Sequence, residues 1–359
     1  MTEFEQRSQG VAAALAGHKM EALLVTSPAN IRYLTGFAGS NGLVLIAGFV
    51  SYFFTDPRYR TEIKGNIHGK VRVSKGPLID HAARILKRRK LKRIGFEPGH
   101  MSVEQHEKLR KALPASFSLK GVSGIVEGLR AIKSPSEIGK IRTSVEANSE
   151  AYLRTLRRVR LGARECDVAA ELDFQMRVLG AEKTAFDTIV AVGERTALPH
   201  AHPTGRKLED NELLLVDMGA TLDGYTSDMT RMSFMGTPGK RIRGLYKAVL
   251  EAQLAGLDAV REGIPVARVD AACREVLKRH ELDRAFVHST GHGLGLEIHE
   301  APRIARKEQT RLQAGMVITI EPGAYIEGLG GVRIEDTVLV TERGCEVLTP
   351  TSKELIQLA

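Results

Sequence analysis

The sequence has few of the cysteines that form disulfides in secreted proteins, and it has no apolar stretch long enough to span a membrane. Among its 359 residues there is no tryptophan, and cysteine occurs only at Cys166, Cys273 and Cys345, without paired spacing. These cysteines do not form a disulfide framework, and we expect all three to be small core residues. No apolar run approaches the roughly 20 residues that a membrane-spanning helix needs, which excludes that class of protein.

The first ten residues, MTEFEQRSQG, are polar and lack the cationic and apolar regions of a secretory signal. Together with the unpaired cysteines, this start predicts a cytoplasmic protein, because disulfides are rare in reducing compartments.

The formal net charge of +9 raises the question of nucleic-acid binding, and the run ILKRRKLKR (85–93) is its strongest local support. The same run fits the end of an amphipathic helix, with Ile85, Leu86 and Leu91 buried and the cations in water. No aromatic residue lies among these cations to stack on bases. We therefore expect neither a nucleic-acid nor a membrane partner.

The length exceeds that of a typical single domain and predicts two domains, 1–128 and 129–359. Within the first, EALLVTS (21–27) and NGLVLIAG (41–48) are typical of buried strands, and LIDHAARILKRRK (78–90) is typical of a helix. This alternation favours an α/β layer with a mixed or parallel sheet.

A helix start marks the beginning of the second domain. Ser134 is placed to cap it, Pro135 takes the first helical position, and Glu137 follows three residues after the cap. The apolar periodicity predicts helices over 137–159, 165–179, 240–262 and 266–281, with strands and turns between them.

The segment LLLVDMGATLDGYTSDMTRMSF (213–234) predicts a hairpin that pairs two aspartates. Asp223-Gly224 favours a two-residue turn, which sets Asp217 opposite Thr230 and makes Asp228 its diagonal neighbour on the same face. Two bare carboxylates held this close would repel unless a cation lay between them. The hairpin therefore indicates a metal site.

The segment GMVITIEPGAYIEGLGGVRIEDTVLVT (315–341) contains two more strand-like runs joined by a glycine-rich connection. Glu321 ends the first run, and Glu335 lies inside the second among apolar neighbours. Either glutamate alone could be a solvated strand residue, but two carboxylates on each of two hairpins favour a shared metal centre.

Between the hairpins, HSTGHGLGLEIHEAPR (288–303) gathers three of the 11 histidines of the chain. His288, His292 and His299 could bind metal, line a substrate pocket or decorate a glycine-rich turn. The glycines suit a backbone that must bring several side chains close to one centre.

Taken together, these motifs resemble the M24 metallopeptidases, the family of methionine aminopeptidase, aminopeptidase P and prolidase. The resemblance extends over nearly the whole chain. NIRYLTGFAGSNG (30–42) and TDPRYR (55–60) are similar to the non-catalytic N-terminal domain of prolidase and creatinase. The resemblance implies an α/β (α+β) protein, with a creatinase-like N-terminal α/β domain followed by a pita-bread catalytic domain. It also implies that the protein is a homodimer.

The resemblance assigns five metal ligands, namely Asp217 in VDMGA, Asp228 in YTSDMTR, His292 in GHGLG, Glu321 in IEPG and Glu335 in VRIED. By resemblance, Asp228 and Glu335 bridge two divalent ions, Asp217 completes one, and His292 with Glu321 completes the other. Two such ions would neutralise the four carboxylates and supply an activated water. Oxygen-rich ligation favours Mn²⁺ or Co²⁺, with Fe²⁺ and Zn²⁺ as alternatives.

The same resemblance implies roles in substrate binding and catalysis. His200 in ALPHAHP and His299 in HEAPR match positions that hydrogen-bond the substrate and steady its oxyanion, and His288 lies closer to the proline pocket. Glu321 is the expected proton shuttle, whereas His202 has no such match and is interpreted as a loop residue.

The activity that these features predict is hydrolysis of Xaa-Pro bonds. Arg303 resembles a prolidase position that holds the carboxylate of an Xaa-Pro dipeptide, which favours a dipeptidase over an aminopeptidase P acting on longer peptides. Arg333 is expected to support the metal carboxylates from behind. A non-catalytic protein that binds nucleic acid or a protein partner is the remaining alternative.

Overall fold

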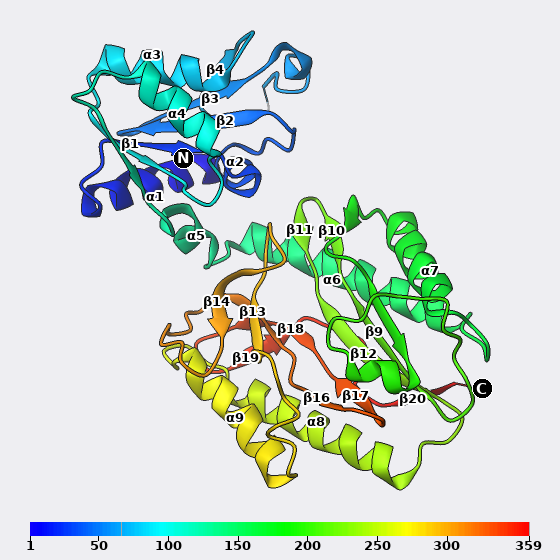
Figure 1. Ribbon diagram of the computed structural model, residues 1–359. Helices are drawn as coiled ribbons and strands as arrows, with labels where there is room; N and C mark the ends of the chain where they lie inside the picture. Colours follow the sequence, from blue (N-terminus) through cyan, green and yellow to red (C-terminus); the bar gives the residue numbers. More distant parts are fainter. Residues whose placement is uncertain (66, 359) are drawn as a thin grey trace. The chain divides into compact units, whose positions relative to one another are not determined.

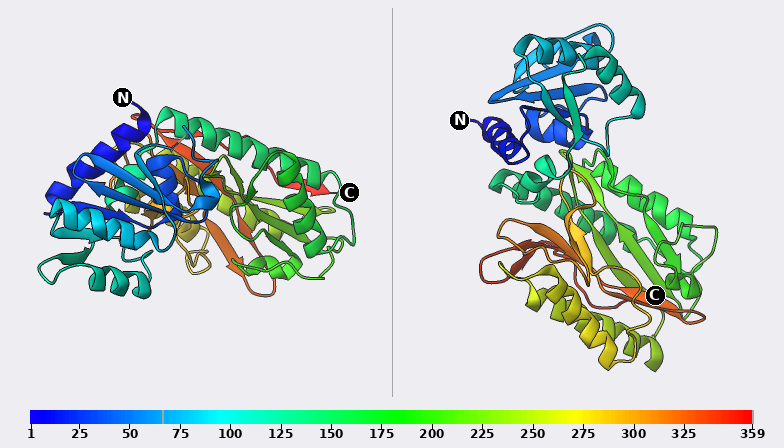
Figure 2. Two further views of the ribbon diagram at one scale, coloured as in Figure 1. Left: turned by 90° about the horizontal axis from the view of Figure 1, so that it is seen from above. Right: turned by 60° about the vertical axis from the view of Figure 1, so that its left-hand side comes forward.

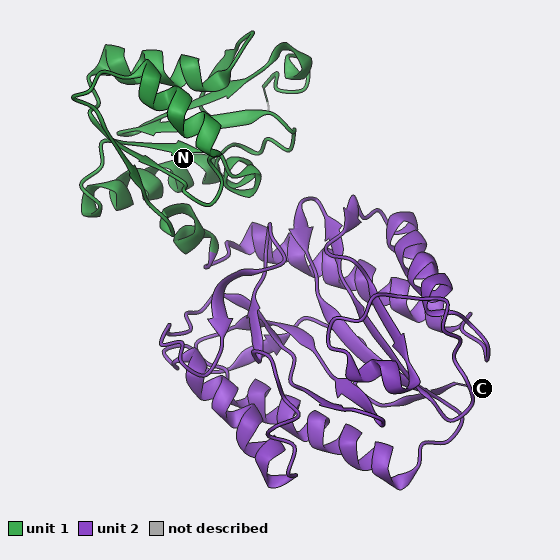
Figure 3. Cartoon of the chain, in the orientation of Figure 1, with its two compact units in different colours: residues 1–130 green, residues 131–359 purple. Residues whose placement is uncertain are grey.

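The computed structural model describes residues 1–65 and 67–358, which form two compact units, Met1–Arg130 and Ala131–Ala359 (Figure 3). No helix among the described residues is long and apolar enough to cross a membrane.

Unit 1 is built on a mixed sheet, as the sequence predicts. Its strands follow the order β4-β3-β2-β1-β5-β6. The β1–β2 and β2–β3 pairs are antiparallel, whereas β3–β4, β1–β5 and β5–β6 are parallel. The strands are β1 (Ala22–Val25), β2 (Gly42–Ala47), β3 (Val50–Thr55), β4 (Lys70–Val73), β5 (Arg93–Phe96) and β6 (Ser118–Gly121).

Helices cover both faces of this sheet (Figure 1). They are α1 (Glu3–Gly17), α2 (Pro28–Thr35), α3 (Leu78–Arg89), α4 (Val103–Ala112) and α5 (Ile125–Arg130), with a 3₁₀ turn η1 (Pro57–Tyr59). Helices α3 and α4 share one apolar core with the strands. Ile85 and Leu86 are buried there, while Lys87, Arg88 and Arg89 are exposed, which confirms the amphipathic interpretation of the basic run.

Unit 2 begins with the capped helix that the sequence predicts. Ser134 accepts a hydrogen bond from the Glu137 amide, the Glu137 carboxylate accepts one from the Ser134 amide, and Pro135 is the first helical residue. The helices are α6 (Pro135–Leu156), α7 (Glu165–Val178), α8 (Lys240–Ala259) and α9 (Val266–Arg279), with a 3₁₀ turn η2 (Gly193–Ala197).

The strands of unit 2 form two larger sheets, ordered β20-β12-β9-β8 and β14-β13-β15-β18-β19, and two small ones, β11-β10-β7 and β16-β17. Their bounds are β7 (Lys183–Thr184), β8 (Ile189–Val192), β9 (Leu213–Met218), β10 (Ala220–Leu222), β11 (Tyr225–Thr226), β12 (Met229–Met235), β13 (Gly291–Gly293), β14 (Glu300–Ile304), β15 (Val317–Ile320), β16 (Gly323–Ile326), β17 (Gly330–Arg333), β18 (Asp336–Val340), β19 (Cys345–Val347) and β20 (Ile356–Leu358). Helices α6 and α7 lie along one side of these strands and α8 with α9 along the other (Figures 1 and 2).

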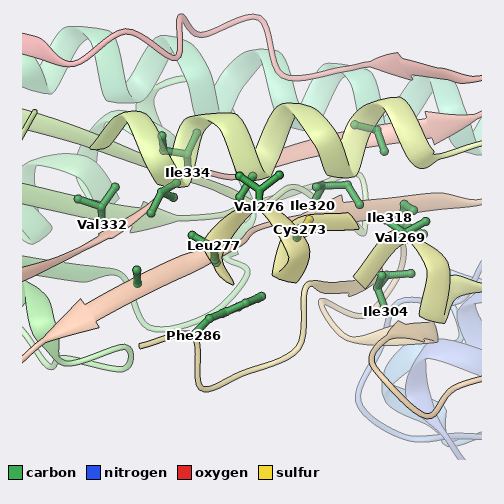
Figure 4. Close-up of a cluster of buried hydrophobic side chains, with 14 of the residues drawn as sticks. Val269, Cys273, Val276, Leu277, Phe286, Ile304, Ile318, Ile320, Val332 and Ile334 are labelled. Atoms are coloured by element: carbon green, nitrogen blue, oxygen red, sulfur yellow. The ribbon is translucent and has the colours of Figure 1, made fainter. Parts of the chain in front are cut away.

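Strand β9 is buried on both faces because it separates two cores. Leu214 and Val216 pack in the core shared with α6 and α7, whereas Leu213 and Leu215 pack in the core shared with α8 and α9. Figure 4 shows the second core, where side chains of α9 meet those of β15 and β17. Asp217 has the parity of Leu213 and Leu215, so its side chain extends this inner face.

The expectation for the cysteines is correct only for Cys273, which is buried in the core of Figure 4. Cys166 and Cys345 are half-buried, and all three are free thiols. Cys166 lies in the first turn of α7 beside the exposed Asp167, on the outer side of a turn whose inner side buries Glu165 and Val168.

Candidate active site

A cavity of about 630 Å³ lies in unit 2 and gathers every ligand and substrate residue that the sequence predicts. Its lining includes Asp217, Asp228, His292, Glu321 and Glu335, the histidines His200, His288 and His299, and the arginines Arg303 and Arg333. These residues come from segments spread over more than 130 positions of the chain, so the fold, not sequence proximity, brings them together.

The first hairpin has the register that the Asp-Gly turn predicts. Asp223 and Gly224 have φ values of 48° and 80°, and Leu222 pairs with Tyr225. Further along the hairpin, Thr230 pairs with Asp217. This register places the Asp217 and Asp228 side chains, both buried, on the face that lines the cavity.

The second hairpin differs from the prediction in one respect. Glu335 was expected inside a strand, but it lies in a break between β17 and β18, and Glu321 lies in the matching break between β15 and β16. Pro322 follows Glu321, and proline has no amide hydrogen to donate to the ladder. The break frees both glutamates from regular pairing, and both line the cavity.

His292 lies on the short strand β13, between two glycines that allow close backbone approach. A Cβ atom at Gly291 would lie 2.0 Å from the Thr319 carbonyl oxygen, and one at Gly293 would lie 2.2 Å from the Ala301 carbonyl oxygen. Any larger residue would push β13 away from its neighbours, so these glycines fix the depth of His292 in the cavity.

The ligand atoms of Asp228, His292 and Glu335 lie within 4.8 Å of one another. His292 Nε2 is 3.5 Å from Asp228 Oδ2 and 3.5 Å from Glu321 Oε1. Both distances are too long for a hydrogen bond and leave room between the ligand atoms. The cluster therefore has the composition and spacing of a metal site.

The electrostatics of these groups favour a bound cation. Burial, followed by repulsion from Glu335, raises the pKa of Asp228 well above its usual value. Burial and the charge of Glu321 act in the same way on the pKa of Glu335. Burial also raises the pKa of Glu321 to about 7. Carboxylates destabilised in this way are the groups that a bound metal ion would keep ionised.

The protonation of His292 also fits a metal ligand. Its Nδ1 atom lies 3.0 Å from the Gly293 carbonyl oxygen, so Nδ1 carries the proton and Nε2 presents its lone pair to the carboxylates. Burial lowers the pKa of His292 to about 4, which leaves the ring neutral at pH 7. A lone pair that faces carboxylate oxygens repels them unless a cation intervenes.

Asp217 supplies one further sign of a cation site. Its Oδ2 atom accepts a hydrogen bond of 2.6 Å from Arg333, but its Oδ1 atom is buried and has no hydrogen-bond partner among residues 1–65 and 67–358. Buried acceptors are rarely left unsatisfied, and divalent ions are common partners of carboxylate oxygens. The residues present thus fit a divalent metal.

Arg333 lies behind the carboxylates, as the sequence predicts, and holds them through several contacts. Its Nε donates to the Thr230 hydroxyl at 3.0 Å, and that hydroxyl donates to Glu335 Oε2 at 2.7 Å. Its Nη1 donates to the Tyr325 hydroxyl at 2.7 Å. Arg333 therefore links the two hairpins, with Thr230 and Tyr325 as partners that the sequence did not single out.

A second buried arginine fixes the backbone beneath the site. Arg231 donates to Asp336 Oδ1 at 2.7 Å and to the Glu335 carbonyl oxygen, and it is almost fully buried. Asp336 also accepts from Lys353 Nζ at 2.6 Å. This network ties the strand that follows Glu335 to the C-terminal segment.

The histidines in the cavity have different surroundings. His200 and His299, which are predicted to bind the substrate, are exposed in the cavity lining. His202, which is interpreted as a loop residue, is also exposed there. His288 uses both ring nitrogens, since Nδ1 lies 2.8 Å from the Ser289 carbonyl oxygen and Nε2 lies 2.9 Å from the Tyr325 hydroxyl. These two contacts fix the orientation of the His288 ring in the cavity lining.

The loop that carries His200 and His202 is held by a fully buried carboxylate. Glu165 accepts hydrogen bonds from the Val192 amide at 3.0 Å and from the Thr204 amide at 2.9 Å, one on each side of the loop. It also accepts from Arg195 Nε at 2.9 Å, and Arg195 in turn donates to the His202 carbonyl oxygen. No motif in the sequence indicates this contact.

Comparison with known proteins agrees with this arrangement. The profile of Metallopeptidase family M24 matches residues 139–342, and that of the Creatinase/Prolidase N-terminal domain matches residues 7–132. The chain is 36% identical to the Xaa-Pro dipeptidase of Pyrococcus furiosus, over 98% of this chain and 100% of that protein.

Two solved structures are similar over nearly their full length. An Xaa-Pro dipeptidase from Bacillus anthracis superposes with a TM-score of 0.96 at 36% identity, covering 99% of this chain and 100% of that one. An X-Pro aminopeptidase from Thermotoga maritima superposes with a TM-score of 0.90 at 34% identity, covering 97% and 99%. These matches confirm the predicted fold, a creatinase-type N-terminal domain followed by a catalytic domain, and the chain belongs to metallopeptidase family M24.

Proposed function

We propose that this metallopeptidase is an Xaa-Pro dipeptidase that holds two divalent ions through Asp217, Asp228, His292, Glu321 and Glu335. The observation that carries the proposal is the convergence of four carboxylates and one neutral imidazole in a single cavity, where Arg333 pairs with Asp217. One arginine does not balance four carboxylates, whereas two divalent cations would.

In this proposal Asp217, Asp228 and Glu335 would hold one ion, and Asp228, Glu335, His292 and Glu321 would hold the other. Oxygen-rich ligands with one imidazole suit Mn²⁺ or Co²⁺, with Fe²⁺ and Zn²⁺ as alternatives. When bound, the ions would supply an activated water and polarise the scissile carbonyl.

The remaining groups bind the substrate and move protons. Glu321 is proposed to carry a proton toward the leaving imino nitrogen, which has no hydrogen of its own in the peptide. His200 and His299, exposed at the cavity wall, are proposed to hydrogen-bond the developing oxyanion. Arg333 keeps Asp217 in place through its 2.6 Å contact.

The preference for dipeptides rests on Arg303. Its side chain lines the cavity and is exposed, and its guanidinium has no hydrogen-bond or ion-pair partner among the described residues. A guanidinium can bind a carboxylate through two parallel hydrogen bonds. The relatives named above include both a dipeptidase and an X-Pro aminopeptidase, so aminopeptidase activity on longer peptides is the second candidate.

The proposal is tested by hydrolysis of Xaa-Pro, Xaa-Ala and Xaa-Pro-Yaa peptides by the metal-depleted chain after addition of Mn²⁺, Co²⁺ or Zn²⁺. We expect metal-dependent cleavage of Xaa-Pro, slower cleavage of Xaa-Ala, and two ions per chain by elemental analysis. Faster cleavage of Xaa-Pro-Yaa would support the aminopeptidase, and no cleavage with any of these ions would contradict both.

We further propose a cytoplasmic homodimer without a nucleic-acid partner. The dimer follows from the family resemblance, and the compartment follows from three free thiols. Light scattering on the purified chain tests the oligomeric state, and a salt-dependent shift with added RNA or DNA would contradict the partner prediction.

A further inference from the structure

One carboxylate in the cavity has no role in the proposed metal site. Asp187 lines the cavity and is exposed, in the loop between β7 and β8. It precedes Ile189 by two residues, and Ile189 pairs with the proposed ligand Asp217. This pairing brings the end of the loop close to Asp217, and both carboxylates line the cavity.

The other charged groups in the cavity lining are accounted for. Glu300 pairs with Lys133 Nζ at 3.3 Å, Arg333 pairs with Asp217, and the remaining carboxylates belong to the proposed metal site. Asp187 forms no hydrogen bond or ion pair with any residue in the described part of the chain. Among these lining residues, Asp187 and Arg303 thus remain as one unpaired anion and one unpaired cation.

The negative charge of Asp187 also affects a neighbour. Burial and then Asp187 raise the pKa of Asp173, which accepts a hydrogen bond from the Thr188 hydroxyl at 2.6 Å. The charge of Arg177 opposes this repulsion, but the net shift of the Asp173 pKa is still upward. The cavity lining at Asp187 therefore has a negative electrostatic potential, which an incoming molecule would encounter.

An Xaa-Pro dipeptide has matching charges. At pH 7 its proline carries a carboxylate and its first residue carries an ammonium, and a lysine in the first position adds another. With the carboxylate at Arg303 and the scissile bond at the metal ligands, the first residue is left to meet the rest of the cavity wall. We propose that Asp187 binds an ammonium group of the first substrate residue, an inference that rests on the proposed peptidase function.

The first experiment compares Lys-Pro with norleucine-Pro, which has the same chain length without the side-chain ammonium, in wild type and in Asp187→Asn. Exposed ion pairs change equilibria up to about fivefold. A loss of about fivefold in kcat/KM for Lys-Pro alone assigns the side-chain ammonium, and an equal loss for both assigns the α-ammonium. Unchanged values for both overturn the inference.

Asp283→Asn is the matched control, because Asp283 is exposed and lies outside the cavity lining. We expect it to leave both substrates unchanged, since its charge cannot contact the first residue. A loss equal to that of Asp187→Asn would show a general effect of net charge and would overturn the inference.

A binding measurement separates this inference from the proposed function. The ligands are ketone analogues of both dipeptides, in which carbon replaces the proline nitrogen and leaves no amide to cleave. Weaker binding of either analogue by Asp187→Asn than by wild type supports the ammonium site, even if wild type cleaves no Xaa-Pro dipeptide and the proposed function fails. Equal affinities overturn the inference, whatever the hydrolysis shows.

Discussion

Glu321 and Glu335 face each other across one hairpin, each at a break in its strand. Ile320 pairs with Asp336 on one side of the break, and Gly323 pairs with Arg333 on the other, so the same register sets the two glutamates opposite. Like charges directly opposite on paired strands destabilise a sheet. The hairpin therefore contains a repulsion that a bound cation would relieve.

Removal of one bridging carboxylate should abolish activity and metal binding. Glu335→Gln and Asp228→Asn keep the side-chain shape but remove a charge that both ions would share, so we expect turnover to fall below detection. Elemental analysis and circular dichroism check the metal content and the fold. Glu327→Gln, an exposed change in the same hairpin, is the control and should keep both ions. Near-normal turnover of either bridging variant would contradict the two-ion site.

Metal removal should reveal the repulsion directly. In the metal-free wild type, burial and mutual repulsion raise the pKa values of Asp228 and Glu335, so these carboxylates destabilise the fold at pH 7. Metal-free Glu335→Gln should therefore melt a few degrees above metal-free wild type, as expected for about 1 kcal/mol in a domain of this size. With Mn²⁺ added the order should reverse, because wild type alone gains binding energy. A variant that melts lower under both conditions would show that Glu335 stabilises the fold by itself.

Substitution of His200 or His299 in the cavity lining should lower kcat without changing the metal content. His200→Ala and His299→Ala remove proposed oxyanion donors, and one such donor contributes roughly 10²–10³ in kcat. We expect the metal content to stay at the wild-type value. His202→Ala is the comparison, because His202 lines the same cavity without an assigned contact, and it should lose less than about tenfold. Metal loss that parallels the loss of kcat would make either histidine a ligand instead.

Glu165 should act on catalysis through the loop that it holds. Glu165→Gln places an amide NH₂ against backbone donors and removes the partner of Arg195, so we expect a loss of about 2 kcal/mol in the free energy of unfolding. Glu165→Gln should also lower kcat, because it releases the loop that carries His200. In a chain that already carries His200→Ala, Glu165→Gln should cause no further decrease in kcat, because both changes act on the same group. Asp167→Asn, an exposed change on the same helix, should leave the free energy of unfolding close to the wild-type value. Additive losses in kcat would separate Glu165 from His200.

The sequence predicted those parts of the site that depend on local rules. The Asp223-Gly224 turn alone determined the register that sets Asp217 opposite Thr230, because a two-residue loop allows one pairing. The helix start at Ser134 was predictable for the same reason, since its capping groups lie three residues apart.

The parts that the sequence did not reveal depend on segments that meet only in the folded chain. At the break, the Glu335 amide donates to the Thr230 carbonyl oxygen of the first hairpin at 3.3 Å, a contact between segments far apart in the sequence. Tyr325, Glu165 and Asp187 carry no motif, and their contacts form only after distant loops pack. Thr230 could have been identified, since the predicted register already placed it beside Asp217.

Arg303 should determine the preferred length of the substrate. In an Xaa-Pro dipeptide the carboxylate lies on the proline, at a fixed distance from the scissile bond, whereas a longer peptide carries it elsewhere. Arg303→Ala should therefore raise KM for Xaa-Pro about tenfold or more, as expected for a lost charged hydrogen bond, and change KM for Xaa-Pro-Yaa little. Arg306→Ala, a change three residues further along and outside the cavity lining, is the control and should leave both values unchanged.

The comparison of the two peptide lengths decides the role of Arg303. Wild type should prefer the dipeptide because a longer peptide would leave the guanidinium unpaired next to its backbone. The variant should lose that preference while keeping its metal, since the Arg303 side chain forms no hydrogen bond or ion pair with a proposed ligand among the described residues. Equal losses on both lengths would assign Arg303 a structural part in β14, where it pairs with His292 across the strands. A wild type that prefers Xaa-Pro-Yaa would instead make the chain an aminopeptidase P and leave Arg303 without a substrate carboxylate to bind.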